Sequence, residues 1–249
     1  MGEVSDKTAI RDRVWTALER AGAAPAGVHG HIPDFTGAAR AAQWLSELAP
    51  WQRARTVKAN PDRAQQSVRS LALTSGKLLF MAVPRLAEPH PFLRLDPTQM
   101  GEEPERYGDR VEAARRAEPV RIDQMPVIDF VVCGSVAVNP EGVRIGKGAG
   151  YADIELALLA EAGLIGEGTT IITTVHELQV LDQPLPRRPH DFTVDYVLTP
   201  DRAITCGPAH RPTGIDWDEL GAEQIEAIPV LRDLAEARSS RGTGHQRKR

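Results

Sequence analysis

The sequence predicts an α/β protein with three layers, α/β/α, built on a mainly parallel sheet with a helical N-terminal segment. Short continuous apolar runs, such as residues 78–83, are typical of strands buried on both faces of a parallel sheet. Segments with helical patterning separate these runs, as they do in βαβ units. A glycine-rich loop at 146–150 connects one predicted strand to the next predicted helix.

The N-terminal segment is expected to be an amphipathic helix over about residues 6–21, with Ser5 as its N-cap. Three apolar side chains recur every four residues, namely Ile10, Val14 and Leu18. Lys7 and Arg11 are also four residues apart, so they share a helix face away from the apolar stripe. On this pattern alone, a solvated face is the ordinary interpretation, because cations gain nothing from a helix N-terminus.

The same signals place the remaining elements. Further helices are expected over 38–48, from the turn at 60–62 to Thr74, over 109–117 and over 151–162. Strands are expected over 56–58, 78–83, 127–132, 169–175 and 194–198. A small hairpin is expected where 135–139 and 143–145 flank an Asn-Pro-Glu-Gly turn. The rest of 87–120 is charged and is interpreted as loop.

The composition indicates one globular domain over residues 1–238, followed by a basic tail at 239–249 that we expect to be disordered. Apolar residues make up 41% of the chain and charged residues 26%, which is the balance of a soluble globular protein. A net charge of -4 argues against a nucleic-acid partner. We expect a monomer or a small homo-oligomer.

Two further classes are disfavoured. No apolar run approaches the roughly 18 residues that a membrane span needs, and the polar N-terminus lacks the core of a signal peptide. The two cysteines, Cys133 and Cys206, have no CxxC partners, which argues against a disulfide framework and a cysteine zinc site. We therefore expect a cytoplasmic protein with reduced thiols and no membrane contact.

The loop at 146–150 is the most informative segment of the chain. Gly146, Gly148 and Gly150 alternate, and Lys147 lies between the first two. Glycines let backbone N–H groups approach an anion closely, and the start of the following helix favours negative charge. Lys147 and Arg144 are suited to neutralising phosphate oxygens, and Asp153 is placed to hold a magnesium ion that bridges phosphates.

Two familiar phosphate motifs do not fit this loop. A Walker loop has four residues between its first glycine and Gly-Lys, followed by Ser or Thr, whereas Gly148 follows Lys147 here. The dinucleotide fingerprint is GxGxxG after a first strand, whereas this loop is GxGxG late in the chain. The residues alone leave two interpretations open: an anion-binding loop, or a tight turn whose Asp153 only stabilises the helix dipole.

The segment 142–153 resembles the hallmark G-x-R-L-G-x-G-x-G-Y-Y-D of the 5-formyltetrahydrofolate cyclo-ligase family, also called methenyltetrahydrofolate synthetase. The residues that fit in register are Gly142, Arg144, Ile145, Gly146, Gly148, Gly150, Tyr151 and Asp153. Other family features follow in the right order: K-x-x-[LI]-R at 7–11, Gly-Lys at 76–77 leading to Pro-Arg at 84–85, and a late group. That late group comprises Gln179, Pro184, His190, Asp191, Asp195 and Thr199.

The resemblance spans about residues 6–200 and includes departures from the family pattern. Ala152 stands where the family has a second tyrosine, and Ile154 replaces the usual basic residue. Cys133 and Asn139 replace a proline and an aspartate. Three stretches, 134–138, 144–153 and 193–200, are more similar to the divergent branch called methenyltetrahydrofolate synthetase domain-containing proteins.

The resemblance implies an enzyme that uses ATP and Mg²⁺ to close 5-formyltetrahydrofolate to 5,10-methenyltetrahydrofolate, a ligase that forms a carbon–nitrogen bond. In the family reaction the formyl oxygen attacks the γ-phosphorus, N10 attacks the activated formyl carbon, and phosphate leaves. The protein mainly positions the reactants and neutralises charge. A loop of backbone donors with cations and no nucleophilic side chain suits those tasks.

The resemblance also implies roles for individual residues. ATP phosphates are expected to be bound by Lys7, Arg11, Gly146, Gly148 and Gly150, and the metal by Asp153. The expected catalytic residues are Arg144, Lys147 and Tyr151. The reduced folate is expected to contact Asp62 and Gln179. For Asp62 the competing interpretation is a helix N-cap, and for Tyr151 it is ordinary packing. Two histidines, His176 and His190, are more often structural than catalytic when no third ligand is spaced with them.

Two alternative functions stay open. One is a nucleotide- or folate-binding protein that kept the fold and lost ring closure, which Ala152 and Ile154 motivate. The other is an ATP-dependent ligase that acts on a different pterin or acid.

Overall fold

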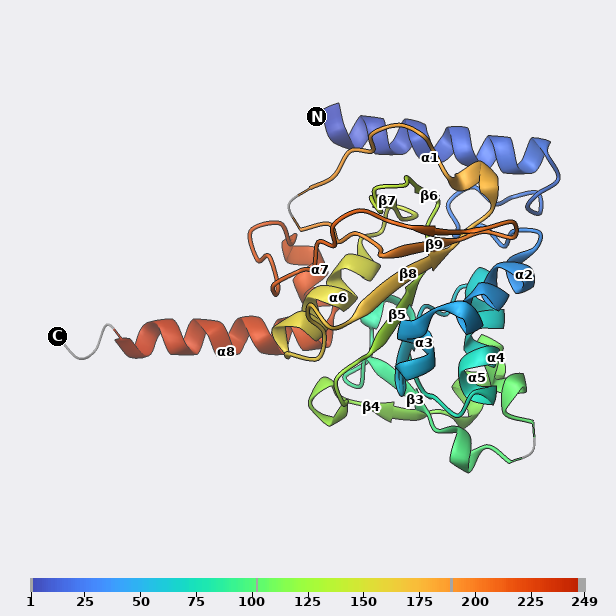
Figure 1. The fold of residues 1–249 in the computed structure, drawn as a ribbon. Coiled ribbons are helices and arrows are strands. Elements are labelled where there is room, and N and C mark those ends of the chain that lie inside the picture. Colours follow the sequence, from blue (N-terminus) through green and yellow to red (C-terminus); the bar gives the residue numbers. More distant parts are fainter. Residues whose placement is uncertain (1, 102, 189, 246–249) are drawn as a thin grey trace.

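The computed structural model describes residues 2–101, 103–188 and 190–245 (Figure 1). The α-helices are α1 (Gly2–Arg20), α2 (Ala38–Gln43), α3 (Ala49–Arg53), α4 (Gln66–Thr74), α5 (Arg110–Arg116), α6 (Tyr151–Glu161), α7 (Ala222–Ala227) and α8 (Pro229–His245). The 3-10 helices are η1 (Trp44–Glu47), η2 (Arg63–Gln65), η3 (Pro84–Leu86), η4 (Pro97–Gln99), η5 (Pro104–Gly108), η6 (Ile122–Gln124) and η7 (Glu177–Gln179).

The strands form one large sheet and one hairpin. The sheet strands are β1 (Thr56–Ala59), β2 (Leu78–Ala82), β3 (Phe92–Leu95), β4 (Glu118–Val120), β5 (Phe130–Cys133), β8 (Thr170–Thr174), β9 (Tyr196–Leu198) and β10 (Ala203–Thr205). They lie in the order β10-β9-β8-β5-β1-β2-β3-β4. The five central strands from β9 to β2 are parallel, and antiparallel strands occupy the edges. The hairpin consists of β6 (Ala137–Val138) and β7 (Arg144–Ile145).

Alternation along the parallel strands produces two apolar layers. In β5, Phe130 and Val132 join the core beneath α2 to α5, whereas Val131 and Cys133 join the core beneath α6 and α8. Figure 1 shows these two groups of helices on opposite sides of the sheet. The three-layer α/β/α prediction is therefore confirmed.

Helix α1 packs outside this sandwich. Its buried residues Ile10, Val14 and Leu18 form a separate apolar cluster with Val136 and Ile145 of the hairpin region. Figure 1 shows α1 lying across the same end of the molecule as β6 and β7. This packing brings the polar face of α1 toward the loop that follows β7.

The structure corrects several sequence predictions. Ser5 is not an N-cap, because α1 already begins at Gly2. The region 87–120 is not mainly loop, because it contains the antiparallel strands β3 and β4. The expected strand over 127–132 begins only at Phe130. The tail predicted to be disordered from Ser239 is helical through His245, and residues 246–249 lie outside the described part of the chain.

The order of the strands fixes where a ligand site belongs. From β1 the chain passes through α4 to β2 on one side, and then returns to β5 on the other side of β1. In open α/β sheets such a reversal leaves a crevice at the carboxyl ends of the two strands that flank it. Within the described residues, no helix has both the length and the apolar character of a membrane span.

Candidate functional site

A cavity of about 1090 Å³ lies at the carboxyl ends of the central strands. Its lining includes residues 60–62 after β1, 82–85 at the end of β2, and Gly134 after β5. Helix α1 contributes Lys7 and Arg11, and the entire segment 144–153 forms another wall. The cavity therefore occupies the place that the reversal of strand order predicts.

The glycine loop has a backbone that other residues would strain. Gly148 and Gly150 have φ angles of 109° and 73°, in the region that side chains disfavour. A Cβ atom on Gly148 would lie 3.4 Å from Cζ of Arg11. Arg11 itself donates from Nε to the Gly146 carbonyl oxygen at 2.7 Å, so α1 holds the loop directly.

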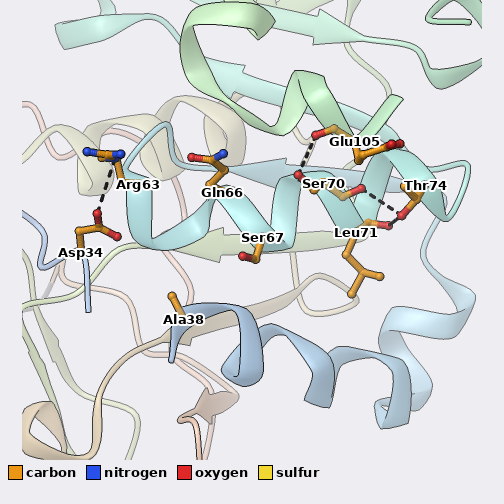
Figure 2. A pocket seen from close by; sticks show the side chains of 9 residues that line it. All are labelled: Asp34, Ala38, Arg63, Gln66, Ser67, Ser70, Leu71, Thr74 and Glu105. Carbon is orange, nitrogen blue, oxygen red and sulfur yellow. Dashed lines mark hydrogen bonds and ion pairs between the residues drawn. The ribbon is translucent and has the colours of Figure 1, made fainter. Parts of the chain in front are cut away.

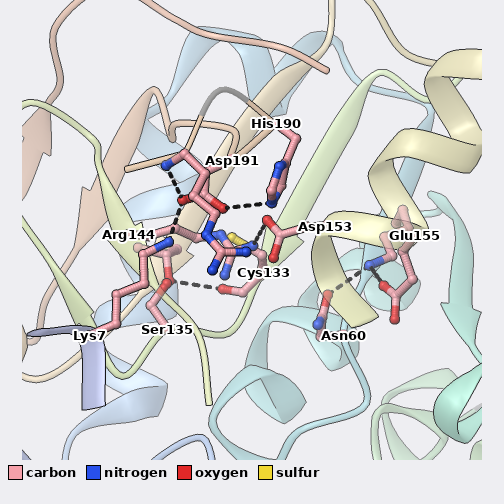
Figure 3. A network of polar contacts seen from close by, with 12 residues as sticks. Lys7, Asn60, Cys133, Ser135, Arg144, Asp153, Glu155, His190 and Asp191 are labelled. Carbon is pink, nitrogen blue, oxygen red and sulfur yellow. Dashed lines mark hydrogen bonds and ion pairs between the residues drawn. The ribbon is translucent and has the colours of Figure 1, made fainter. Parts of the chain in front are cut away.

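Arg144 is the most deeply buried cation of the loop. Its Nη2 donates to Oδ1 of Asp153 at 2.7 Å, and its guanidinium lies 4.0 Å from the ring centre of Phe192 (Figure 3). Burial alone would lower the pKa of Arg144, but the charge of Asp153 and this hydrogen bond outweigh burial and raise it. Arg144 therefore stays charged, and its buried Nε has no hydrogen-bond partner among the described residues.

Lys7 reaches the same region from α1. Its Nζ lies 2.5 Å from Oδ2 of Asp191, and Figure 3 shows that carboxylate between Lys7 and His190. Burial would raise the pKa of Asp191, but the Arg188 backbone N–H and Lys7 lower it overall. Lys7 and Asp191 are 184 residues apart in the sequence, so the fold alone creates this pair.

Lys147 and Asp62 face each other across the cavity, with Nζ and Oδ1 3.7 Å apart. Asp62 occupies the N-cap position of η2, but its side chain makes no capping hydrogen bond. A Cβ atom on Gly134 would lie 3.1 Å from Oδ2 of Asp62, so glycine at 134 leaves room for this carboxylate. The geometry therefore favours a role toward the cavity over the capping alternative for Asp62.

The structure does not bring every candidate to the cavity. Tyr151, the first residue of α6, lines it, whereas Gln179 does not. Both N–H groups of the Gln179 amide donate to backbone carbonyls, of Ser135 and Val136, and its oxygen accepts from the His176 backbone. Gln179 is 1% exposed and its amide holds the backbone before the hairpin, so it does not reach the cavity.

The two histidines differ. The Nδ1 atom of His176 accepts the Leu178 backbone N–H and caps η7, and burial lowers the pKa of its ring. His190 lines the cavity beside Asp191. Asp153 is the carboxylate nearest to Arg144, and no group of three or more metal-ligating side chains gathers anywhere in the described residues. A metal there would take most of its ligands from phosphate and water, as magnesium does.

One buried polar group at this cavity was not predicted from the sequence. Lys58 of β1 bonds Asn60 and forms an ion pair with Glu155 of α6, and both partners line the cavity. A lysine inside the mostly buried strand β1 was the available signal. Its partner could not be found by spacing, because Lys58 and Glu155 are 97 residues apart.

Two other cavities carry less chemistry. One of about 500 Å³ lies between α2 and α4 (Figure 2), where the hydroxyls of Ser70 and Thr74 donate to the backbone carbonyls of Glu105 and Ser70. Another of about 690 Å³ lies on the opposite side of the glycine loop, where residues 210–216 form its outer wall.

The sequence model of the 5-formyltetrahydrofolate cyclo-ligase family matches residues 3–200. This chain belongs to that family. The matched span contains all of α1 except Gly2, the glycine loop and every residue assigned to the cavity above. The family resemblance drawn from the sequence is therefore confirmed.

Relatives within the cyclo-ligase family include two named methenyltetrahydrofolate synthase domain-containing protein. The Mus musculus protein is 42% identical over 252 residues, covering 95% of this chain and 65% of the relative. The Homo sapiens protein is 37% identical over 244 residues, covering 92% of this chain and 61% of the relative. The chain thus spans less than two thirds of the length of these relatives.

A solved structure shares the fold. The NMR structure of Aquifex aeolicus 5,10-methenyltetrahydrofolate synthetase superposes with a TM-score of 0.53 and 17% sequence identity. The match covers 86% of this chain and 99% of that one. At this identity the likeness supports the architecture, and the chemistry has to be argued from the residues of this chain.

Proposed function

We propose that this chain converts 5-formyltetrahydrofolate to 5,10-methenyltetrahydrofolate, with ATP and Mg²⁺. Membership of the cyclo-ligase family supports the reaction class. The observation that carries the proposal is the convergence of a strained glycine loop and four cations on one large cavity: Lys7, Arg11, Arg144 and Lys147.

The loop end of the cavity suits a triphosphate. Backbone N–H groups of the loop and the N-terminus of α6 favour anions, and Gly150 caps that helix in a left-handed conformation. Lys7, Arg144 and Lys147 each face a carboxylate that a phosphate oxygen can replace. Asp153 is the proposed magnesium ligand, and a magnesium ion bound there would neutralise charge on the phosphates.

The rest of the cavity suits the folate. The formyl oxygen of the substrate attacks the γ-phosphorus of ATP, and ADP leaves; N10 then attacks the formyl carbon, and phosphate leaves. Arg144 and Lys147 stabilise the charge that develops on the transferred group. Tyr151 borders the meeting point of the two substrates, and Asp62 offers a carboxylate to the reduced folate.

The test is an assay of the purified protein with ATP, Mg²⁺ and 5-formyltetrahydrofolate. Methenyl absorbance should rise in step with the release of ADP and phosphate, and omission of ATP or chelation of the metal should stop it. Direct binding of ATP and of the folate is measured on the same preparation.

Ala152 motivates one competing function. A protein of this fold that binds both ligands but closes no ring would give binding without methenyl absorbance or ADP. ATP hydrolysis that depends on another pterin or acid would instead indicate a different substrate. Either result would overturn the proposed reaction.

A further inference from the structure

A polar group lies buried at the base of the same cavity. Lys58 extends from β1, has 0% exposure, and donates to Oδ1 of Asn60 at 2.7 Å. It also pairs with Oε2 of Glu155, which projects from the second turn of α6 (Figure 3). Asn60 and Glu155 line the cavity, whereas Lys58 lies behind them.

Burial of these charges is costly. Removing an ammonium and a carboxylate from water costs several kcal/mol per ion, and a well-packed apolar pair is often at least as stable. The residues that pair with Lys58 on the two neighbouring strands, Phe80 and Val131, are both apolar and buried. Stability alone therefore gives little reason for a buried lysine and glutamate at this position.

Only one of the two carboxylate oxygens of Glu155 accepts a hydrogen bond from the protein. Lys58 takes Oε2, while Oε1 has no hydrogen-bond donor among the residues that the structure describes. Glu155 is 5% exposed, and the open side of the residue is the cavity. A carboxylate oxygen that is open to a cavity and has no donor in the protein is suited to a donor on a ligand.

The position of Glu155 restricts what that ligand offers. Lys58 holds the carboxylate and is itself held by Asn60, so Glu155 presents a fixed acceptor with a negative charge. Nearby walls from β2, Met81 to Val83, are apolar and suit the faces of a flat ring. A planar heterocycle with adjacent N–H and NH₂ donors on one edge fits an oriented carboxylate of this kind.

We propose that Glu155, held in place by Lys58, binds the 2-amino-4-oxopyrimidine edge of the pterin ring. This inference rests on the proposed function, because it assigns one part of the folate to one part of the same cavity. Glu155 acts as a specificity-determining residue: it selects ligands with the amino-pyrimidine edge and leaves phosphoryl transfer to the loop. Asp62 is separated from this role by its ion pair with Lys147 at the loop.

The experiment replaces both charges together, because either charge alone would be left buried without its partner. K58M/E155L keeps similar volumes, so it should fold with a melting temperature near or above that of the wild type. The probes are 5-formyltetrahydrofolate and its 2-desamino-2-methyl analogue, which lacks the amino donor. Titration calorimetry measures the Kd of each probe, and that of ATP, for both proteins.

K77M is the matched control. Lys77 is another buried lysine, but it donates to the Trp51 and Ala54 carbonyls and does not line the cavity. Its replacement should destabilise the fold without changing the preference between the two probes. The control separates loss of stability from loss of recognition.

The wild type should bind the amino probe about 10- to 100-fold more tightly than the analogue, the value of a hydrogen bond to a charged group. K58M/E155L should lose most of that preference and keep its affinity for ATP. An unchanged preference in this variant would overturn the inference and leave the proposed function standing. Failure of the wild type to bind either probe would overturn both.

Discussion

The two ends of the cavity use the same chemistry, cations paired with carboxylates, in different settings. At the loop end, the pairs Lys7–Asp191 and Lys147–Asp62 are partly exposed and join segments on opposite sides of the cavity. At the base, Lys58 and Glu155 are buried and join the centre of the sheet to α6. Arg144 and Asp153 are intermediate: the guanidinium is buried, while its carboxylate partner is more open.

This difference indicates which charges can change partners. A partly exposed pair loses less when a phosphate replaces the carboxylate, because water and ligand compensate the released charge. A buried pair cannot separate without leaving an uncompensated ion in the interior. The loop end is therefore built to exchange partners with a highly charged ligand, and the base is built to present one fixed acceptor.

The largest effect is expected at the buried cation of the loop. Arg144→Met removes charge from the site of phosphoryl transfer and leaves Asp153 without its partner. The kcat/KM for ring closure should fall at least about 1000-fold. Arg202→Met is the matched control, because Arg202 forms an exposed pair with Glu177. If Arg144→Met retains turnover within tenfold of the wild type, the transferred phosphoryl group does not lie at Arg144.

A smaller effect is expected from the backbone of the loop. Gly148→Val forces a β-branched residue into a φ of 109° and places its side chain against Arg11. ATP affinity should fall by about 100-fold, as the backbone loses its close approach to phosphate. Gly168→Val is the control, because no atom lies within 4 Å of a Cβ there. Equal ATP affinity in the two folded variants would contradict the loop assignment.

Replacing the two cations of α1 that line the cavity should have a moderate effect on ATP affinity. The double replacement of Lys7 and Arg11 by Met should weaken ATP binding about tenfold or more, with only a small change in melting temperature. Arg13→Met, on the same helix but bonded to Gln183, should leave ATP affinity unchanged. A double variant that melts much earlier but binds ATP normally would make these cations structural.

The smallest expected effect is an increase in catalytic activity. Ala152→Tyr restores the aromatic residue of the family pattern at a position that lines the cavity. Because an aromatic contact contributes on the order of 1 kcal/mol, kcat/KM for 5-formyltetrahydrofolate should rise by up to about tenfold. ATP affinity should stay constant. A variant and a wild type that both bind ATP without any turnover would favour the binding-protein alternative.

Local sequence patterns were sufficient to predict most of the helices and strands. The apolar runs at 78–83 and 169–175 are strands because a residue buried on both faces of a sheet has to be apolar throughout. The turn sequence predicted the hairpin, and the glycine before α6 predicted the start of that helix. Strands β3 and β4 were missed because Arg94 and Glu118 pair with each other across the sheet edge, which hides any apolar run.

The sequence by itself determined the loop at 146–150, since the positive φ angles of Gly148 and Gly150 are a local property of the backbone. The tertiary structure alone decided which side chains meet there. Asp191 comes to Lys7, and Glu155 comes to Lys58, through strand order and helix packing over 184 and 97 residues. Periodicity reports which face of an element is buried. It does not report which charged group on a distant segment will satisfy a buried cation, because that choice depends on the packing of the whole sheet.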